Sequence, residues 1–370
     1  MKRPHLVHFL AIKTDEFLAI KASVTMKENL ATTGDDRDLS VARFPIQEFR
    51  LLRSDDFGIK IVALDSNHRE IFRKTYDSDS FGNFSFKIPL SEGLKEVQVL
   101  QVYEIKKRPG LELNLGTFIP LFISGAKRLV VCDFDKTLVD TRFSSTREMV
   151  TSLTRPLEYF PTVHESVRIF KSYIEEGHHP FILSASPHFY EDAMRDWLYK
   201  NGIYTAGIFL KDYRKVFSLW EGDLTPKDLK LQGLYKLGHL LDILTMTGIP
   251  DELVLMGDNF ESDPIIYLTL SKILCDDIDP WALWNKLKNH DIFQLTAKQN
   301  GQFLNKMYHL HNMSTRQKNT RRQVRPKVTI YIRKKFPEDT VTVPDFWRDK
   351  VSLIKSFDAQ SNPPEIMNAQ

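Results

Sequence analysis

Two carboxylates one residue apart follow an apolar run of strand length. The run from Leu129 to Cys132 lacks polar alternation, which is typical of a strand buried on both faces of a parallel sheet. Asp133 and Asp135 come directly after it, on one side of the strand, with Phe134 on the other. Close carboxylates repel each other unless a cation lies between them, and oxygen ligands suit Mg²⁺, which commonly also binds substrate phosphate. Such a pair also occurs in surface turns, and the rest of the chain decides between a metal site and a turn.

A second apolar run, from Pro180 to Leu183, ends in Ser184. Because ligands bind beyond the carboxyl ends of strands in open α/β sheets, this hydroxyl would arrive beside the two acids. It can donate a hydrogen bond to a phosphate oxygen, although a serine in this position is more often a helix cap. Ser184 alone therefore indicates little.

A third predicted strand, from Glu252 to Met256, leads into a glycine and several acids. Gly257 lets the backbone turn closely, and Asp258 emerges where it can join Asp133 on the metal. Asp263, with Glu261, follows as an acceptor for metal-bound water or for a lysine. Three strand ends therefore carry groups suited to one phosphate and one cation.

A helix predicted from the leucine spacing between Leu234 and Leu244 carries a lysine, whose functional role needs support from outside this pattern. Lys236 lies off the leucine stripe of a predicted helix, close to its beginning. Lysine on a helix flank is most often solvated, and Lys230 and Lys211 are rival candidates for the same role.

The composition is that of a soluble globular protein. The chain has 370 residues, 42% of them hydrophobic and 27% charged, a net charge of +3 and two cysteines. A disulfide framework or a cysteine zinc site is therefore unsupported, and a reducing, cytoplasmic location is expected. The apolar stretch Leu6 to Ile12 is too short for a signal peptide, and no window suits a membrane span, so any contact with a membrane is expected to be peripheral.

The pattern of the chain changes near residue 125. Residues 1–125 read as short strands separated by turns, which predicts an all-β, sandwich-like accessory domain. From 126 to 336, apolar runs alternate with amphipathic helices, which predicts an α/β domain with a parallel sheet. The polar stretch Thr141 to Phe160 predicts a flap over the site, with no room for a large cap.

The carboxyl-terminal part is basic. It contains an expected helical insertion at about 278–327, and no acid lies between Asp291 and Glu338. This cluster fits a solvated surface, a nucleic-acid contact or a patch for anionic lipid. Residues 337–370 are expected to be disordered. The basic residues of the cluster are Arg316, Lys318, Arg321, Arg322, Arg325, Lys327, Arg333, Lys334 and Lys335.

Together, D-F-D-K-T, the strand-end serine, a helix-borne lysine and G-D-N-F-E-S-D resemble the four motifs of the haloacid-dehalogenase-like (HAD) phosphohydrolase superfamily. Within it, the chain is most similar to the actin-patch-associated phosphatidate phosphatase family and its bacterial relatives. That likeness rests on Ser184 to Pro187, Leu210 to Asp212, Gly257 to Pro264 and Ile330 to Arg333. The chain departs from the usual family pattern at Lys136 and Asn259 and in the basic insertion.

The resemblance implies a HAD-like Rossmannoid sheet with a minimal cap and a Mg²⁺-dependent phosphatase that works through an aspartyl-phosphate. It implies that Asp133 is the nucleophile and Asp135 the general acid and base, with Ser184 and Lys236 completing the catalytic group. The spacing to Asp258 selects Lys236. The implied metal ligands are Asp133, Asp135, Asp258 and Asp263, and the implied substrate-binding residues are Thr137, Ser184, Ser186 and Lys236.

The substrate is a separate question, because motifs fix the reaction centre and not the bound molecule. An open site favours a bulky phosphomonoester, and phosphatidate at an anionic membrane surface fits both the family and the basic cluster. A phosphatase of nucleic-acid ends fits the same cluster. A non-catalytic module that binds phosphate lipids is the third alternative, but that reading goes with loss of the second aspartate, and Asp135 is present.

Overall fold

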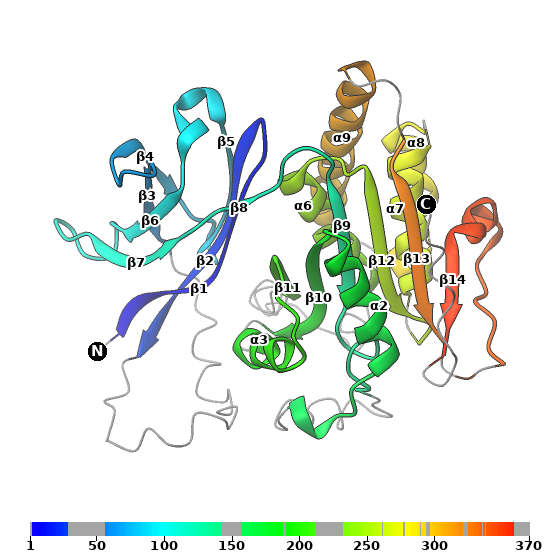
Figure 1. The fold of residues 1–370 in the computed structure, drawn as a ribbon. Helices are drawn as coiled ribbons and strands as arrows, with labels where there is room; N and C mark the ends of the chain where they lie inside the picture. The colour runs from blue at the N-terminus through cyan, green and yellow to red at the C-terminus, as the bar shows by residue number, and fades with distance from the viewer. Residues whose placement is uncertain are drawn as a thin grey trace. The chain divides into compact units, whose positions relative to one another are not determined.

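A computed structural model describes most of the chain (Figure 1). The described residues are 2–28, 56–141, 157–187, 190–211, 232–260, 262–276, 278–288, 290–293, 297–320, 325–334, 336 and 338–358. The chain divides into two compact units. Met1–Gly125 makes up nearly all of the first unit, and most of the residues from Ala126 onward belong to the second.

The first unit contains two four-stranded sheets, with strand orders β5-β2-β1-β8 and β4-β3-β6-β7. One face of β2 points into the core, because Leu18, Ile20, Ala22 and Val24 join the apolar core cluster. Residues from both sheets join in one apolar cluster, which is the packing of a β-sandwich. The strands are β1 Lys2–Lys13, β2 Phe17–Glu28, β3 Gly58–Leu64, β4 Glu70–Asp77, β5 Asn83–Pro89, β6 Val99–Glu104, β7 Leu113–Phe118 and β8 Leu121–Phe122.

The second unit is built on a six-stranded sheet of order β11-β10-β9-β12-β13-β14. The central strand β9 pairs in parallel with β10 and with β12, and β13 pairs in parallel with β12 and β14. The strands are β9 Arg128–Asp133, β10 His179–Pro187, β11 Gly207–Lys211, β12 Glu252–Asp258, β13 Lys327–Arg333 and β14 Ile354–Phe357. The predicted parallel α/β sheet is confirmed.

Strand order fixes where a ligand can enter this sheet. From β9 the chain builds β10 and β11 on one side and then crosses to β12 and β13 on the other. The connections that follow β9 and β12 therefore run in opposite directions along the sheet. In open α/β sheets, the ligand crevice lies at such a point, beyond the carboxyl ends of the strands.

Helices cover the sheet (Figure 1). α6, α7, α8 and α9 pack against one another, and Figure 1 shows them behind the sheet, with α2 in front of it. The longest helix, α9, buries Phe303, Met307 and Leu310 at helical spacing, so the basic insertion contributes to the core of this unit. The helices are α2 His164–Glu175, α3 Glu191–Lys200, α6 Gln232–Thr247, α7 Asp263–Cys275, α8 Pro280–Leu287 and α9 Ala297–Thr320.

The prediction of a disordered tail from residue 337 is wrong for residues 338–358. This segment forms a 3-10 helix, η8 (Asp345–Leu353), and then the edge strand β14. Trp347 is buried and donates a hydrogen bond from Nε1 to the Thr269 hydroxyl over 3.0 Å. Two buried aromatic side chains, Trp347 and Phe357, therefore fix a stretch whose composition is mostly polar. Residues 359–370 lie outside the described part, as do Arg321, Arg322, Lys335 and most of the predicted flap.

His178, between α2 and β10, makes the stability of this unit dependent on pH. Its ring is buried, and Nδ1 lies 3.1 Å from the carbonyl oxygen of Tyr173. Burial lowers the pKa of His178 below its ordinary value, although the Glu252 carboxylate opposes this shift. The unfolded chain therefore binds a proton that the folded chain excludes, so the stabilisation is complete above a pH of about 6.5 and is lost as the pH falls below it.

We expect the free energy of unfolding in urea to fall between pH 7.5 and pH 5.5, with a smaller pH dependence in His178→Gln. His179, whose pKa burial and His178 also lower, leaves a residual slope. The matched control is His164→Gln, since His164 is exposed. An unchanged slope in His178→Gln would contradict this explanation.

Candidate active site

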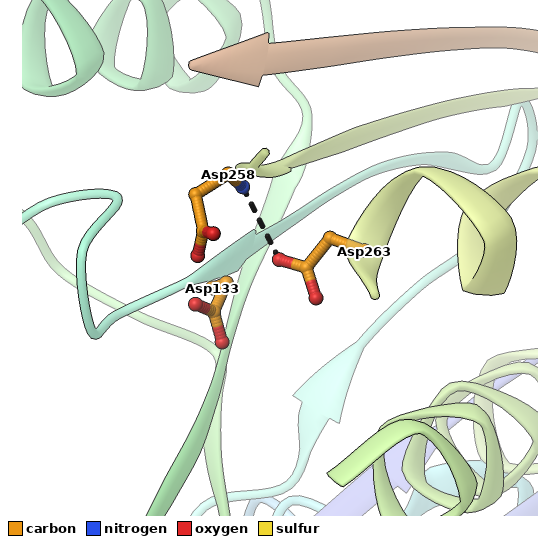
Figure 2. A group of neighbouring side chains, drawn as sticks. All are labelled: Asp133, Asp258 and Asp263. Carbon is orange, nitrogen blue, oxygen red and sulfur yellow. Dashed lines mark hydrogen bonds between the residues drawn. The ribbon is translucent and has the colours of Figure 1, made fainter. Parts of the chain in front are cut away.

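Two neighbouring parallel strands deliver the acids predicted from the sequence. Asp133 is the last residue of β9 and Asp258 is the last residue of β12. Asp263 is the first residue of α7, whose second residue is Pro264, a favoured residue at a helix start. Figure 2 shows the three carboxylates pointing toward a common centre, and one oxygen atom from each lies within 4.8 Å of the others. All three side chains are buried.

Gly257 allows Asp263 to close onto the end of β12. A Cβ atom at residue 257 would lie 2.4 Å from Asp263 Oδ2 and 2.7 Å from the ring of Tyr267, which is too close for any side chain. With glycine in place, the backbone N–H of Asp258 donates to Asp263 Oδ2 over 3.3 Å, the dashed line in Figure 2. The Tyr267 hydroxyl donates to the carbonyl oxygen of Met256 over 2.8 Å. The glycine predicted from the sequence therefore has a steric role in the acid cluster.

Lys236 is the lysine that the fold brings to these acids. Its Nζ lies 2.6 Å from Asp263 Oδ1 and forms an ion pair of 3.1 Å with Asp133 Oδ1. Its side chain is 1% exposed, which shows that it is not one of the solvated lysines usual on a helix flank. Of its rivals, Lys211 ends β11, with Nζ 5.7 Å from the centre of the Tyr235 ring. Lys230 lies outside the described residues.

The buried charges do not balance within this group. Three carboxylates face one ammonium, which leaves a formal excess of two negative charges away from solvent. Close carboxylates repel one another, and a divalent cation between them would screen this repulsion. Carboxylate oxygens are ligands that Mg²⁺ prefers, and each of the three acids offers one oxygen to the common centre. The residues present therefore fit a magnesium ion.

Replacing Lys236 tests this charge balance. In Lys236→Met the acids lose their ammonium partner, and we expect the free energy of unfolding in urea to fall by about 3–5 kcal/mol without Mg²⁺, as for other broken buried ion pairs. Added Mg²⁺ should restore part of this loss. The control is Lys306→Met, because Lys306 is 40% exposed and pairs with Asp242 at the surface, where such pairs contribute about 1 kcal/mol or less. Equal losses in the two variants would contradict the assignment.

The hydroxyl groups of three side chains contact the Asp135 carboxylate, which follows β9 beside the acid cluster. Its Oδ2 accepts a hydrogen bond of 2.7 Å from Ser184 and one of 3.5 Å from Ser186, and its Oδ1 accepts one of 3.3 Å from Thr141. The Ser184 hydroxyl also accepts from the backbone N–H of Ser186 over 3.0 Å. The serine predicted to contact phosphate is therefore placed to orient Asp135, and the Asp135 carboxylate lies outside the three-acid group.

Two further predicted positions are buried. Thr137 is fully buried, and its hydroxyl has no hydrogen-bond partner among the residues that the structure describes, so its contact with substrate stays a prediction. Burial and the neighbouring Asp133 carboxylate hold the pKa of the Cys132 thiol well above its ordinary value. Cys132 is therefore a buried core residue.

Sequence reasoning missed one residue of this site, Arg333. The sequence places it both in the family-like segment Ile330 to Arg333 and in the basic cluster, without a role in the site. Its side chain is 2% exposed and lies at the end of β13, beside Asp258 in the register of the sheet. The sequence contains a feature that could have identified Arg333. The strand-length segment Val328 to Ile332 leads into a polar residue, as do the other strands of the site.

Comparisons with solved structures give overlaps of low quality. A β-glucuronidase of Parabacteroides merdae with glycerol in its active site matches at 12% identity and a TM-score of 0.24, over 89% of this chain and 33% of that chain. A calcium-binding mutant of Bacteroides uniformis β-glucuronidase 2 matches at 10% identity and a TM-score of 0.25, with the same coverage. The chain spans about a third of the length of these proteins. These values relate neither its fold nor its activity to theirs, and no curated protein matches the sequence.

A family match covers the part of the chain that carries the site. Residues 128–280 match the family described as phosphatidate phosphatase APP1, catalytic domain. This range includes Asp133, Lys236, Asp258 and Asp263, and it confirms the likeness to phosphatidate phosphatases predicted from the motifs. Residues 128–280 of this chain are therefore similar to the catalytic domain of phosphatidate phosphatase APP1.

Proposed function

We propose that this protein is a Mg²⁺-dependent phosphomonoester hydrolase with a HAD-like domain, that phosphatidate is its substrate, and that it forms an aspartyl-phosphate. The observation that carries the proposal is the buried group of Asp133, Asp258, Asp263 and Lys236 at the carboxyl edge of a parallel sheet, within the segment that matches the family. The acids lie beyond the carboxyl ends of β9 and β12, which is where an open α/β sheet of this strand order binds its ligand. This position supports a HAD-like arrangement.

In the first half of the reaction, a carboxylate oxygen of Asp133 attacks the phosphorus atom. A bond forms between this oxygen and phosphorus, the ester oxygen leaves with its bonding electrons, and Asp135 in its protonated form gives that oxygen a proton. When bound, Mg²⁺ screens the repulsion between the carboxylate and the phosphate and stabilises charge on the phosphate oxygens. The ammonium of Lys236, 3.1 Å from Asp133, supplies positive charge on the same side.

In the second half, Asp135 acts as a base. It takes a proton from a water molecule whose oxygen attacks phosphorus, and the bond between phosphorus and Asp133 breaks to release inorganic phosphate. Asp135 ends protonated and ready for the next substrate. The hydroxyls of Ser184 and Thr141 fix its direction for both transfers, because each contacts a different oxygen of the carboxylate.

We further propose that the site meets its substrate at an anionic membrane surface. Among the described residues, no helix is long and apolar enough to span a membrane. The aromatic pair Tyr159 and Phe160 adjoins Pro161, whose carbonyl oxygen accepts from the Asp140 amide in the loop after β9. Tyr159 is 64% exposed, as suits an aromatic at a membrane interface. Arg333 takes no part in this contact, because it is buried.

A substrate screen tests the proposed activity. Phosphate release should be measured from phosphatidate in vesicles, lysophosphatidate, 5′-phosphorylated oligonucleotides and a soluble aryl phosphate, each with and without Mg²⁺. Preference for phosphatidate is expected. Faster release from oligonucleotide ends would overturn the lipid substrate, and binding of phosphatidate vesicles without release of phosphate from any substrate would show a non-catalytic module.

A matched pair of variants tests the membrane contact. Tyr159→Ser should lower the rate on phosphatidate vesicles while leaving the rate on the aryl phosphate within about twofold. The control is Tyr204→Ser, since Tyr204 is 74% exposed but precedes the amino end of β11, whereas Tyr159 adjoins the loop at the carboxyl end of β9. Equal effects of the two substitutions on vesicles would contradict the proposed contact.

A further inference from the structure

Arg333 is a buried cation that the chemical steps above do not use. It is the last residue of β13 and lies opposite Asp258 in the register of the sheet. Arginine is rarely buried unless its guanidinium is held by partners. Its contacts reach two loops, one following β9 and one following β12.

In the loop after β9, Arg333 contacts both a backbone carbonyl and a carboxylate. Nη1 donates to the carbonyl oxygen of Lys136 over 2.5 Å, and Nη2 lies 3.3 Å from Asp140 Oδ2. Lys136 has a φ angle of +60°, in the left-handed region that residues other than glycine seldom adopt, so its surroundings must hold it there. The Thr141 hydroxyl contacts both the Lys136 amide, over 3.2 Å, and Asp135. The conformation of Lys136 is therefore coupled to the position of the Asp135 carboxylate.

In the loop after β12, Arg333 contacts the residues next to Asp258. Its guanidinium carbon lies 5.7 Å from the centre of the Phe260 ring, and its carbonyl oxygen accepts from the Asn259 amide over 2.9 Å. The Phe260 amide in turn donates to Asp258 Oδ1 over 2.6 Å. The side chain and the backbone of one arginine therefore support the segment that directs Asp258.

We propose that Arg333 is a positioning residue that fixes the two loops relative to each other, so that Asp135 and Asp258 keep their directions around the acid cluster. This inference rests on the proposed function for its effect on turnover, but the contacts themselves do not depend on it. The planar guanidinium reaches Lys136, Asp140 and the Phe260 ring together. The ammonium of a lysine is a point charge and cannot reproduce that geometry.

Kinetics on the soluble aryl phosphate test the effect on catalysis. In Arg333→Lys we expect kcat to fall by about 10–100-fold, as for other residues that support metal ligands, with KM changed by less than about threefold and a higher Mg²⁺ concentration needed for half-maximal rate. The control is Lys272→Met, which removes a buried lysine that contacts Asp349 over 2.7 Å, about two and a half turns along α7 from Asp263. It should lower Tm but leave kcat within about twofold.

Asp140→Asn keeps the test valid if Arg333→Lys folds poorly. It weakens one contact of the guanidinium and should lower kcat in the same direction but less. If Arg333 acts through Asp140, adding Asp140→Asn to Arg333→Lys should lower kcat by less than the product of the two single effects. If the two reductions in kcat multiply fully in the double variant, Arg333 and Asp140 act separately, and the proposal that Arg333 acts through Asp140 is overturned.

Hydrogen exchange separates failure of this inference from failure of the proposed function. In the full chain, Arg333→Lys should speed amide exchange in residues 134–141 and 258–260, and Lys272→Met should not. If the wild-type protein releases no phosphate but exchange rises in both loops, the positioning role stands and the proposed activity fails. If wild-type activity is present while exchange and kcat in Arg333→Lys match the wild type, the positioning role is overturned.

Discussion

Asp133→Asn should abolish phosphate release while the protein remains folded. An amide lacks the charge and nucleophilicity needed to attack phosphorus, so we expect kcat to fall on the order of 10⁴-fold or more, as when a catalytic nucleophile is removed from other enzymes. The substitution also removes one negative charge from a buried group that has an excess of them. Tm without Mg²⁺ should therefore stay the same or rise.

Phosphate release and thermal unfolding of the same preparation check both parts of this prediction. The control is Asp251→Asn, because Asp251 lies at the opposite end of β12, where its carboxylate accepts from the Lys127 amide over 2.7 Å. It should leave kcat within about twofold. An Asp133→Asn protein that releases phosphate at the wild-type rate, or one whose Tm falls sharply, would contradict the assignment of Asp133.

Removal of Mg²⁺ should have the second largest effect. With a chelator present, we expect phosphate release to fall to background, because the carboxylates then repel the phosphate. Because only the folded protein binds the ion at this site, Mg²⁺ also raises the free energy of unfolding, by about 2.7 kcal/mol at a concentration a hundred times the Kd. Tm should therefore rise steadily with the logarithm of the Mg²⁺ concentration.

Asp258→Asn makes this test specific to the acid cluster. With one carboxylate fewer, the variant should need about 10–100 times more Mg²⁺ for half-maximal activity and show a correspondingly weaker dependence of Tm on Mg²⁺. Wild-type activity that persists after dialysis against a chelator would exclude a magnesium enzyme. The same Mg²⁺ dependence in Asp258→Asn and wild type would place the ion elsewhere.

Two acids of the cluster could be predicted from the sequence because each ends a recognisable strand. The buried runs before Asp133 and Asp258 lack polar residues, and parallel strands present their carboxyl ends at one edge of a sheet. Lys236 was harder to identify, because its role depends on how α6 packs against the end of β9, and spacing alone left Lys211 and Lys230 as rivals.

Elements stabilised mainly by their neighbours cannot be recognised from the local sequence. β4 has an exposed, charged sequence and is defined by its pairing with β3. β14 is a short edge strand that follows a polar, proline-containing stretch, and its pairing with β13 and the burial of Phe357 fix it. Arg333 looked like one more surface cation, because nothing local shows that Lys136 and Asp140, nearly two hundred residues earlier, supply its partners. Such partners are long-range contacts that local sequence patterns do not encode.

The most direct test of the mechanism is to locate the phosphoryl group on the enzyme during turnover. Phosphatidate labelled in its phosphate should be mixed with the wild-type protein and Mg²⁺, quenched rapidly in acid and digested, and the labelled peptide identified by mass spectrometry. We predict that the label is bound to Asp133, that treatment with alkali releases it as expected for an acyl phosphate, and that omission of Mg²⁺ prevents labelling. Label on any other residue, or none at any quench time while phosphate continues to be released, would contradict nucleophilic attack by Asp133.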